Sequence, residues 1–257
     1  MSHLAPPPGA PWFHMRPLPQ AGARAWLARD EAKHATGSRR LSPGDEIVLC
    51  DGSGRVAVSR LGSERADDGS VAVTVERQLE CEPPRPFVTL ATAVPKGDRW
   101  STLLDMAGQL GVDGILPLDC ERSVVPTSSI RRDRAERILM ESCKQAKRPA
   151  CPQLLPPSTP LDAVRSGVGR GSGVVAIAHP ESEPLSRFVD DSPLTILVGP
   201  EGGFTDREIA ECGAAGAVLA SLGTCILRIE TACVAAIVRA RWFSGERLKW
   251  SVPGSNR

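Results

Sequence analysis

Residues Leu197–Ile209 read LVGPEGGFTDREI and are the most informative stretch of this chain. The apolar residues that lead into it, Thr195–Val198, predict a short buried strand. Helical sequence resumes after Gly202–Gly203, where Thr205 and Glu208 have the spacing of a capping box, so we expect the helix to begin at Thr205. Glycines between a strand and a helix let the backbone approach a ligand closely.

A second irregular loop, Leu222–Arg228, follows about twenty residues later and leads through Glu230–Ala232 into an apolar helix. The first loop holds a single acid, Glu201, between Pro200 and Gly202. Two glycine turns at the carboxyl ends of adjacent strands are where an open α/β sheet builds a ligand crevice. The sequence therefore predicts a ligand site formed by these two loops.

Together the two loops resemble one protein family. GPEGGF followed by LG-x-x-ILR-x-ETA is similar to the C-terminal signature of the 16S ribosomal RNA uridine-N3 methyltransferases, in the SPOUT (trefoil-knot) superfamily. The resemblance is close over roughly residues 88–240 and weak in the N-terminal part. Shorter upstream matches lie at Lys96–Arg99, Leu110–Val112, Ile115–Pro117, Glu121–Ser123 and Ala178–Glu181.

This resemblance implies two domains. Residues 1–82 are expected to form a small PUA-like β-barrel that binds RNA, and residues 83–257 an α/β trefoil-knot (SPOUT) methyltransferase domain with a parallel sheet. The implied activity is S-adenosylmethionine-dependent N3-methylation of one uridine in small-subunit ribosomal RNA, without a metal. The implied partners are that RNA or the 30S particle and a second copy of the chain in a homodimer.

The resemblance also assigns the cofactor to the two loops and to the strand end at Ala178–His179. His179 is expected to form pocket wall rather than to act as a catalyst, and the apolar residues of the second loop to sandwich the adenine. The expected cofactor-binding residues are Ala178, His179, Gly199, Pro200, Glu201, Gly202, Gly203, Leu222, Gly223, Ile226 and Leu227.

Three charged residues are candidates for catalysis. The N3–H of uridine is a weak acid, so methyl transfer needs a donor that stabilises negative charge on O2 and O4, or a base that removes the proton. Arg228 can serve as the donor, and Glu201 or Glu230 as the base; the sequence leaves the choice of base open. The alternative interpretation of Arg228 and Glu230 is a structural ion pair at the start of a helix.

Basic residues are concentrated in residues 121–148, which hold eight Lys and Arg against four acids. Such a segment forms either a solvated helix face or an RNA contact. Residues 239–257 carry a similar excess of positive charge. The expected RNA-binding residues are Arg99, Arg122, Arg131, Arg132 and Arg148.

Composition narrows the class of protein. The formal net charge of the 257 residues is +1, which gives no global argument for nucleic acid. The eight cysteines include no C-x-x-C pair, so the spacing typical of zinc ligands is absent. Most of the cysteines are expected to be small buried apolar residues of a protein in a reducing compartment. No apolar run reaches membrane length, and the proline-rich start differs from a signal peptide, so a cytoplasmic location is expected.

The first eighty residues predict a small β domain. We expect a strand at Trp12–Met15, a helix near Ala21–His34, and a hairpin whose strands, Asp45–Cys50 and Arg55–Leu61, flank the turn Asp51–Gly54. A further strand is expected at Ser70–Arg77, and the proline-rich residues Cys81–Pro86 predict a stiff linker.

Strands and helices alternate beyond the linker, which indicates a parallel sheet covered by helices. The expected strands are Phe87–Ala93, Gly114–Leu118, Val174–Ala178, Thr195–Val198 and Ala217–Ala220, and the expected helices are Ser101–Leu110, Ser129–Lys147, Asp206–Gly213 and Thr231–Trp242. The glycine-rich run Gly167–Gly173 precedes a strand instead of following one, so it predicts a connection and not a dinucleotide loop.

The chain departs from the family pattern at a few positions, which keeps two alternatives open. One is a related methyltransferase that acts on another RNA position, and the other is an RNA-binding assembly factor that holds the cofactor without transferring methyl. Arg228 and Glu230 favour the enzyme. The departures are Ser101, Asp105, Met106, Gln109 and Lys144.

Overall fold

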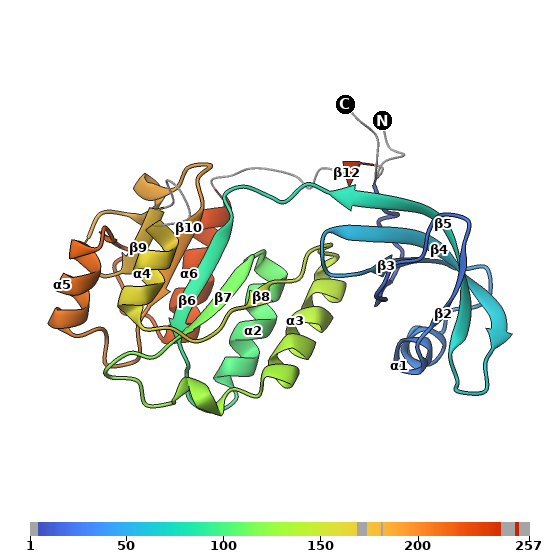
Figure 1. Ribbon diagram of the computed structural model, residues 1–257, viewed down its shortest axis with the longest axis horizontal. Helices are drawn as coiled ribbons and strands as arrows, with labels where there is room; N and C mark the ends of the chain where they lie inside the picture. Colours follow the sequence, from blue (N-terminus) through green and yellow to red (C-terminus); the bar gives the residue numbers. More distant parts are fainter. Residues whose placement is uncertain (1–4, 169–173, 181, 243–249, 252–257) are drawn as a thin grey trace. The chain divides into compact units, whose positions relative to one another are not determined.

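The computed structural model describes residues 5–168, 174–180, 182–242 and 250–251, and it divides into two compact units (Figure 1). The first unit comprises Met1–Pro83, Cys143–Cys151 and Leu248–Arg257, and the second comprises Pro84–Ser142 and Pro152–Arg247. The domain boundary predicted from the sequence, between residues 82 and 83, places both of the later segments of the first unit in the second domain.

The first unit is built on a curled six-stranded sheet with strand order β1-β3-β4-β5-β12, in which β2 also pairs with β5. Register shifts between Val58 and Ser59 and between Leu61 and Arg65 interrupt the β4–β5 ladder, and such irregularities bend a sheet. The strands are β1 (Trp12–His14), β2 (Arg24–Leu27), β3 (Glu46–Cys50), β4 (Arg55–Arg65), β5 (Val71–Cys81) and β12 (Trp250–Ser251).

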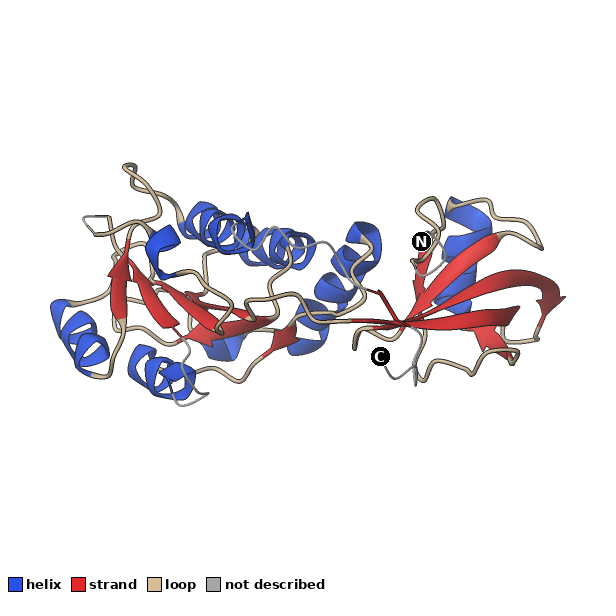
Figure 2. Cartoon of the chain, turned by 90° about the horizontal axis from the view of Figure 1, so that it is seen from above, coloured by secondary structure: helices blue, strands red, loops and turns tan. Residues whose placement is uncertain are grey.

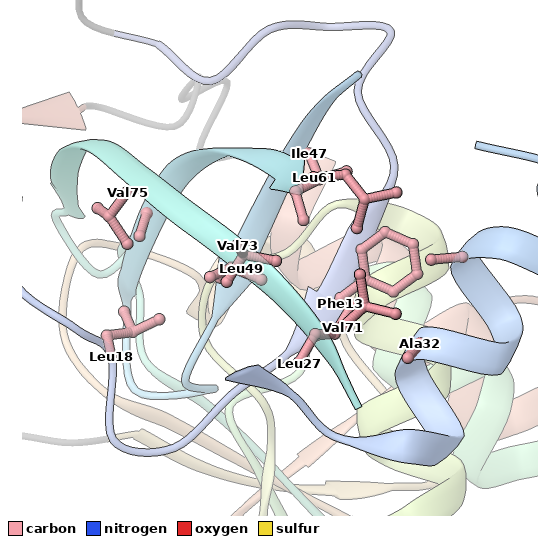
Figure 3. Packing of buried hydrophobic residues seen from close by; sticks show 12 residues of the cluster. Phe13, Leu18, Leu27, Ala32, Ile47, Leu49, Leu61, Val71, Val73 and Val75 are labelled. Atoms are coloured by element: carbon pink, nitrogen blue, oxygen red, sulfur yellow. The ribbon is translucent and has the colours of Figure 1, made fainter. Parts of the chain in front are cut away.

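The predicted hairpin is confirmed. Strands β3 and β4 pair antiparallel from Glu46–Arg60 to Cys50–Val56. In the turn between them, Gly52 and Gly54 both have positive φ, and the Asp51 carboxylate accepts a hydrogen bond of 2.8 Å from the Ser53 backbone N–H. A core of the unit gathers side chains of the strands, among them Phe13, Leu49 and Val73, together with Leu18 and Ala32 from outside the strands, as Figure 3 shows.

The helix expected near Ala21–His34 is wrong in its first half. Residues Arg24–Leu27 form β2, which pairs antiparallel with Val71–Thr74 of β5 and buries Leu27 completely. Pairing with a distant strand therefore outweighs the local helix preference. Helical structure begins only with α1 (Arg29–Lys33) and continues as the π-helix η1 (His34–Ser38).

The second unit holds a six-stranded, all-parallel sheet with strand order β11-β9-β10-β6-β7-β8. All six residues of β6 are buried, as expected for a central strand with both faces covered. The strands are β6 (Val88–Ala93), β7 (Gly114–Leu118), β8 (Gln153–Leu154), β9 (Val174–Ala178), β10 (Leu194–Val198) and β11 (Val218–Ala220).

Helices cover both faces of this sheet (Figure 2). Helix α6 packs against β6, β10 and α2, whereas α4 packs against β9, β10 and α5. The helices are α2 (Arg99–Leu110), α3 (Arg132–Ala146), α4 (Pro160–Val168), α5 (Asp206–Ala214) and α6 (Ile229–Trp242), with the short 3-10 helices η2 (Thr127–Ser129) and η3 (Leu185–Phe188). The α/β alternation predicted from the sequence is therefore confirmed.

Some elements differ from the prediction. Helix α3 begins at Arg132 instead of Ser129, because Ile130 has an extended backbone that separates it from η2. Helix α4 and strand β8 were not predicted. The glycine-rich run begins inside α4, and its residues 169–173 lie outside the described part of the chain.

Candidate active site

The turn from β10 into α5 is held by the predicted capping box. The Glu208 backbone N–H donates to the Thr205 side chain at 3.2 Å, and the Thr205 backbone N–H donates to Glu208 Oε2 at 2.8 Å. Glu208 is buried, and its other oxygen accepts a hydrogen bond of 2.9 Å from the backbone N–H of Glu121, which follows β7. The cap therefore fixes two neighbouring loops at the carboxyl edge of the sheet.

The glycines of the first loop have different structural roles. Gly203 has φ +70°, a conformation that favours glycine. A Cβ on Gly199 would lie 3.0 Å from the ring of Phe204, so glycine lets that ring pack against the loop. Gly202 has no positive φ, and its carbonyl accepts a hydrogen bond of 2.9 Å from Arg122 Nη1.

The second loop connects β11 to α6. Gly223 has φ +141°, and its backbone N–H donates to Ser221 Oγ at 3.2 Å, which closes a tight turn. Ile226 is 95% exposed, whereas Ile229 at the start of α6 is buried. An aliphatic side chain that stands almost wholly in solvent on a structured loop is suited to cover an apolar ligand.

The two loops and the end of β9 enclose a cavity of about 590 Å³. Every residue predicted to bind the cofactor lines this cavity except Gly202, whose place is beside Arg122. The sequence analysis missed a further set of lining residues, namely Pro180, Val198, Phe204, Asp206, Ile209, Cys225, Ile229 and Ala232. The i, i+3 spacing of Ile229 and Ala232, which puts both on one face of α6, was the available signal.

Arg99 joins the two candidate carboxylates. Its Nη2 donates a hydrogen bond of 3.0 Å to Glu201 Oε1, and its Nη1 lies 3.6 Å from Glu230 Oε2. Glu230 is the more buried of the two acids, with its side chain 15% exposed against 38% for Glu201. An arginine at the start of α2 therefore holds one acid of the first loop and one acid at the start of α6.

Arg228 makes no ion pair with Glu230, so the structural ion pair considered from the sequence is wrong. The Arg228 side chain is exposed at the cavity wall, and the described part of the chain supplies no hydrogen bond or ion pair to its guanidinium. A free guanidinium can donate two parallel hydrogen bonds to a carbonyl or phosphate. Among the described residues, the cavity thus presents one unpaired cation, Arg228, and two carboxylates, those of Glu201 and Asp206, of which Arg99 holds Glu201.

The arginines predicted to bind RNA are in different environments. Arg99 and Arg122 are engaged within the site, and Arg132 pairs with Glu136 at 2.8 Å and donates to the Leu154 carbonyl. Arg131 is exposed. Arg148 is half-buried and belongs to the first unit.

Lys144, counted among the basic residues, is not a surface charge. It is 8% exposed and its Nζ lies 2.6 Å from Glu31 Oε1 within the first unit. Its charge is therefore used inside the protein, because an unpaired ammonium would be costly to bury.

Six of the eight cysteines are buried, as expected, whereas Cys151 is half-buried and Cys225 is exposed. Burial raises the pKa of the Cys120 and Cys233 thiols to about 12 and that of Cys212 to about 11, so they stay protonated. Cys225 is exposed on the second loop. Among the residues that the structure describes, no group of three or more His, Cys, Asp or Glu could hold a metal ion, and no helix is long and apolar enough to cross a membrane.

Comparison with known proteins identifies both parts of the chain. A model of the RNA methyltransferase domain matches residues 82–241, and a model of the RNA methyltransferase PUA domain matches residues 27–74. The ribosomal RNA small subunit methyltransferase E of Mycobacterium bovis is 34% identical over 247 residues, which cover 90% of this chain and 92% of that protein. The Synechocystis protein of the same name is 31% identical, over 78% of this chain and 67% of its own length.

A solved structure has the same fold. The crystal structure of a ribosomal RNA small subunit methyltransferase E from Neisseria gonorrhoeae, bound to S-adenosyl methionine, aligns with a TM-score of 0.80 and 26% identity. The alignment covers 91% of this chain and 98% of that one. With its RNA methyltransferase domain and its PUA domain, this chain belongs to the ribosomal RNA small subunit methyltransferase E family.

Proposed function

We propose that this protein transfers the methyl group of S-adenosylmethionine to N3 of one uridine in small-subunit ribosomal RNA. The observation that carries the proposal is the cavity between the two glycine loops, where an unpaired guanidinium and an anchored carboxylate share one wall. The names of the relatives support ribosomal RNA as the substrate.

The cavity fits the cofactor in size and chemistry. Its volume of about 590 Å³ is within the range of roughly 300–1,000 Å³ that is usual for small-molecule sites. We assign the adenine to the apolar side chains of Leu222, Ile226 and Leu227. The bound adenine would cover the exposed side chain of Ile226. When bound, S-adenosylmethionine supplies an electrophilic methyl group. The S-adenosyl methionine of the Neisseria structure supports this assignment.

We assign charge stabilisation to Arg228. Negative charge develops on the uracil carbonyl oxygens as N3 loses its proton, and a guanidinium with no partner among the described residues is free to donate to them. Arg99 holds Glu201 and Glu230, so it is a positioning residue for both candidate bases. Single substitutions of Glu201 and of Glu230 distinguish which carboxylate removes the proton.

The first unit would bind the RNA around the target, because its central part matches the PUA domain of RNA methyltransferases. We propose that the protein acts in the cytoplasm on the RNA or the 30S particle and that it works as a homodimer. The trefoil knot of the second unit is likewise a proposal, supported by the all-parallel sheet and by the family.

The proposal is tested by incubating purified protein with S-adenosylmethionine and 30S particles, or 16S RNA, that lack the modification. Digestion and mass spectrometry should then find N3-methyluridine at one position. Methyl at another atom or base would support the related methyltransferase. Binding of both ligands without transfer would support the assembly factor.

A further inference from the structure

The second unit contains a second cavity, of about 280 Å³, which the cofactor assignment does not use. It opens at the same carboxyl edge of the sheet, beyond β6, and is lined by the first turn of α2 and the first turns of α3. Trp100, Leu104 and Ile138 form an apolar wall, and Arg131 and Arg134 bring two positive charges to it. A wall of this kind beside two cations is suited to an amphipathic anion.

The two guanidinium groups are unengaged. Within the part of the chain that the structure describes, neither Arg131 nor Arg134 has a side-chain hydrogen bond or ion pair, and both residues are exposed. Their neighbour Arg132 is different, since it pairs with Glu136 and donates to the Leu154 carbonyl. Of these three arginines at the start of α3, the two that line the cavity are therefore the two left free to bind a phosphate.

The wall also carries groups that could read a nucleoside. Trp100 is half-buried at this wall, and an aromatic ring of this kind is a surface on which a base can stack. The Asp98 side chain makes no capping hydrogen bond at the start of α2, so its carboxylate can accept from a base N–H or a ribose hydroxyl. Apolar surface, a carboxylate and paired guanidinium groups together match one nucleotide.

This cavity adjoins the candidate active site along the chain. Asp98 and Trp100 line it, while Arg99 between them holds Glu201 at the wall of the cofactor cavity. A nucleotide bound here would lie one residue along the backbone from the group that positions the candidate bases.

Resting on the proposed function, we propose that this cavity is a subsite for one nucleotide of the substrate RNA next to the target uridine. Arg131 and Arg134 bind its phosphate, and Trp100 and Ile138 contact its base. The RNA strand is the occupant that the charges favour, because two unpaired guanidinium groups outnumber the one carboxylate in the lining.

The test uses the full-length protein and fluorescently labelled 16S RNA transcript, with binding measured over a range of salt. Ser101→Trp places a neutral ring at the cavity wall, and its control is Thr102→Trp, which changes the next, exposed residue outside the lining. Arg131→Ala/Arg134→Ala removes both cations. Arg137→Ala, an exposed and unpaired arginine of the same helix outside the cavity, is its control.

We expect Ser101→Trp to weaken RNA binding about tenfold or more, the loss that follows when one base is no longer held against the protein. It should raise KM for RNA and leave kcat and the melting temperature near the wild-type values. The double arginine variant should also flatten the salt dependence of log K by about 0.7 to 0.9 for each lost phosphate contact. Both control variants should bind RNA like the wild type.

Wild-type RNA affinity in Ser101→Trp would overturn the subsite, as would an equal loss in Arg137→Ala. If the variants lose affinity for 30S particles but bind naked RNA like the wild type, the cavity binds a ribosomal protein instead. If the wild type itself neither binds nor methylates the RNA, the proposed function fails and the subsite fails with it. If the wild type methylates the RNA and the cavity variants bind RNA as the wild type does, the subsite is contradicted and the proposed function stands.

Discussion

Arg99 Nη2 donates a hydrogen bond of 3.0 Å to Glu201 Oε1, and this contact joins the start of α2 to the glycine loop after β10. The same guanidinium reaches Glu230 at the start of α6, at 3.6 Å. One arginine therefore fixes the acidic side of the candidate active site. Because its side chain is only 33% exposed, the pairing is partly shielded from solvent.

We expect Arg99→Ala to lower the single-turnover methylation rate by about tenfold or more, because misplaced catalytic groups lose effective concentration. Arg99→Ala should change the free energy of unfolding by about 1 kcal/mol or less, since ion pairs that are partly open to solvent, such as Arg99–Glu201, contribute little to stability. Arg165→Ala, which removes an exposed ion pair with Asp162 in the same unit, is the control and should leave the rate unchanged. A wild-type rate in Arg99→Ala would contradict the positioning role.

Gly203→Val should abolish or strongly weaken cofactor binding. The residue lines the cavity with φ +70°, where a β-branched side chain is strained by about 1–3 kcal/mol. Calorimetry with S-adenosylmethionine measures the effect. The matched control is Gly213→Val in α5, where no positive φ is required and the added side chain meets open space. Equal cofactor affinity in the Gly203 variant and the wild type would remove this loop from the site.

Stability should depend on pH through His14 in the first unit. Burial lowers the pKa of His14 below the usual 6.5. The negative charge of Glu31 opposes this shift, and the positive charges of Arg16 and Lys144 lower the pKa further. A lowered folded-state pKa means that the unfolded chain binds the proton more readily, so this contribution to stability is complete above about pH 6.5. It is lost as the pH falls through the folded-state pKa.

Urea unfolding of the wild type and of His14→Gln at several pH values checks this contribution. The unfolding free energy of the wild type minus that of His14→Gln should decrease as the pH falls below about 6.5. Carboxylates titrate in both proteins, so their contribution cancels in this difference. A difference that does not vary with pH would show that His14 has no part in the titration.

Arg228→Lys should lower the single-turnover methylation rate by roughly 10²-fold or more, the order expected when one charge-stabilising donor is lost. Lysine keeps the charge but cannot reproduce the planar pair of donors. The melting temperature should not change, because Arg228 has no ion pair to lose among the described residues. A stable variant that methylates at the wild-type rate would end the catalytic assignment.

Local sequence patterns were sufficient for much of the second unit. Alternating apolar runs and caps predicted its five longer strands and the start of α5 at Thr205, because these signals lie within a few residues of each other. The glycine loops predicted a ligand site where the structure has the 590 Å³ cavity, and its use by the cofactor stays a prediction. Only Gly202 fell outside it, since its backbone φ and its contact with Arg122 depend on the folded loop.

Long-range pairing was not predictable in this way. Arg99 lies far along the chain from Glu201 and Glu230, and only the parallel order of β6 and β10 brings their loops together. Lys144 looked like part of a basic surface until folding paired it with Glu31. Strand β2 was mistaken for helix because its partner, β5, is also distant in sequence.

Mapping of modified nucleosides in small-subunit ribosomal RNA, with and without this gene, tests the central claim most directly. We expect a single uridine to lose its N3-methyl group when the gene is deleted, and the wild-type gene to restore it. The Arg228→Lys gene should restore it slowly or in part. An unchanged level of N3-methyluridine in the deletion strain would contradict the proposed function.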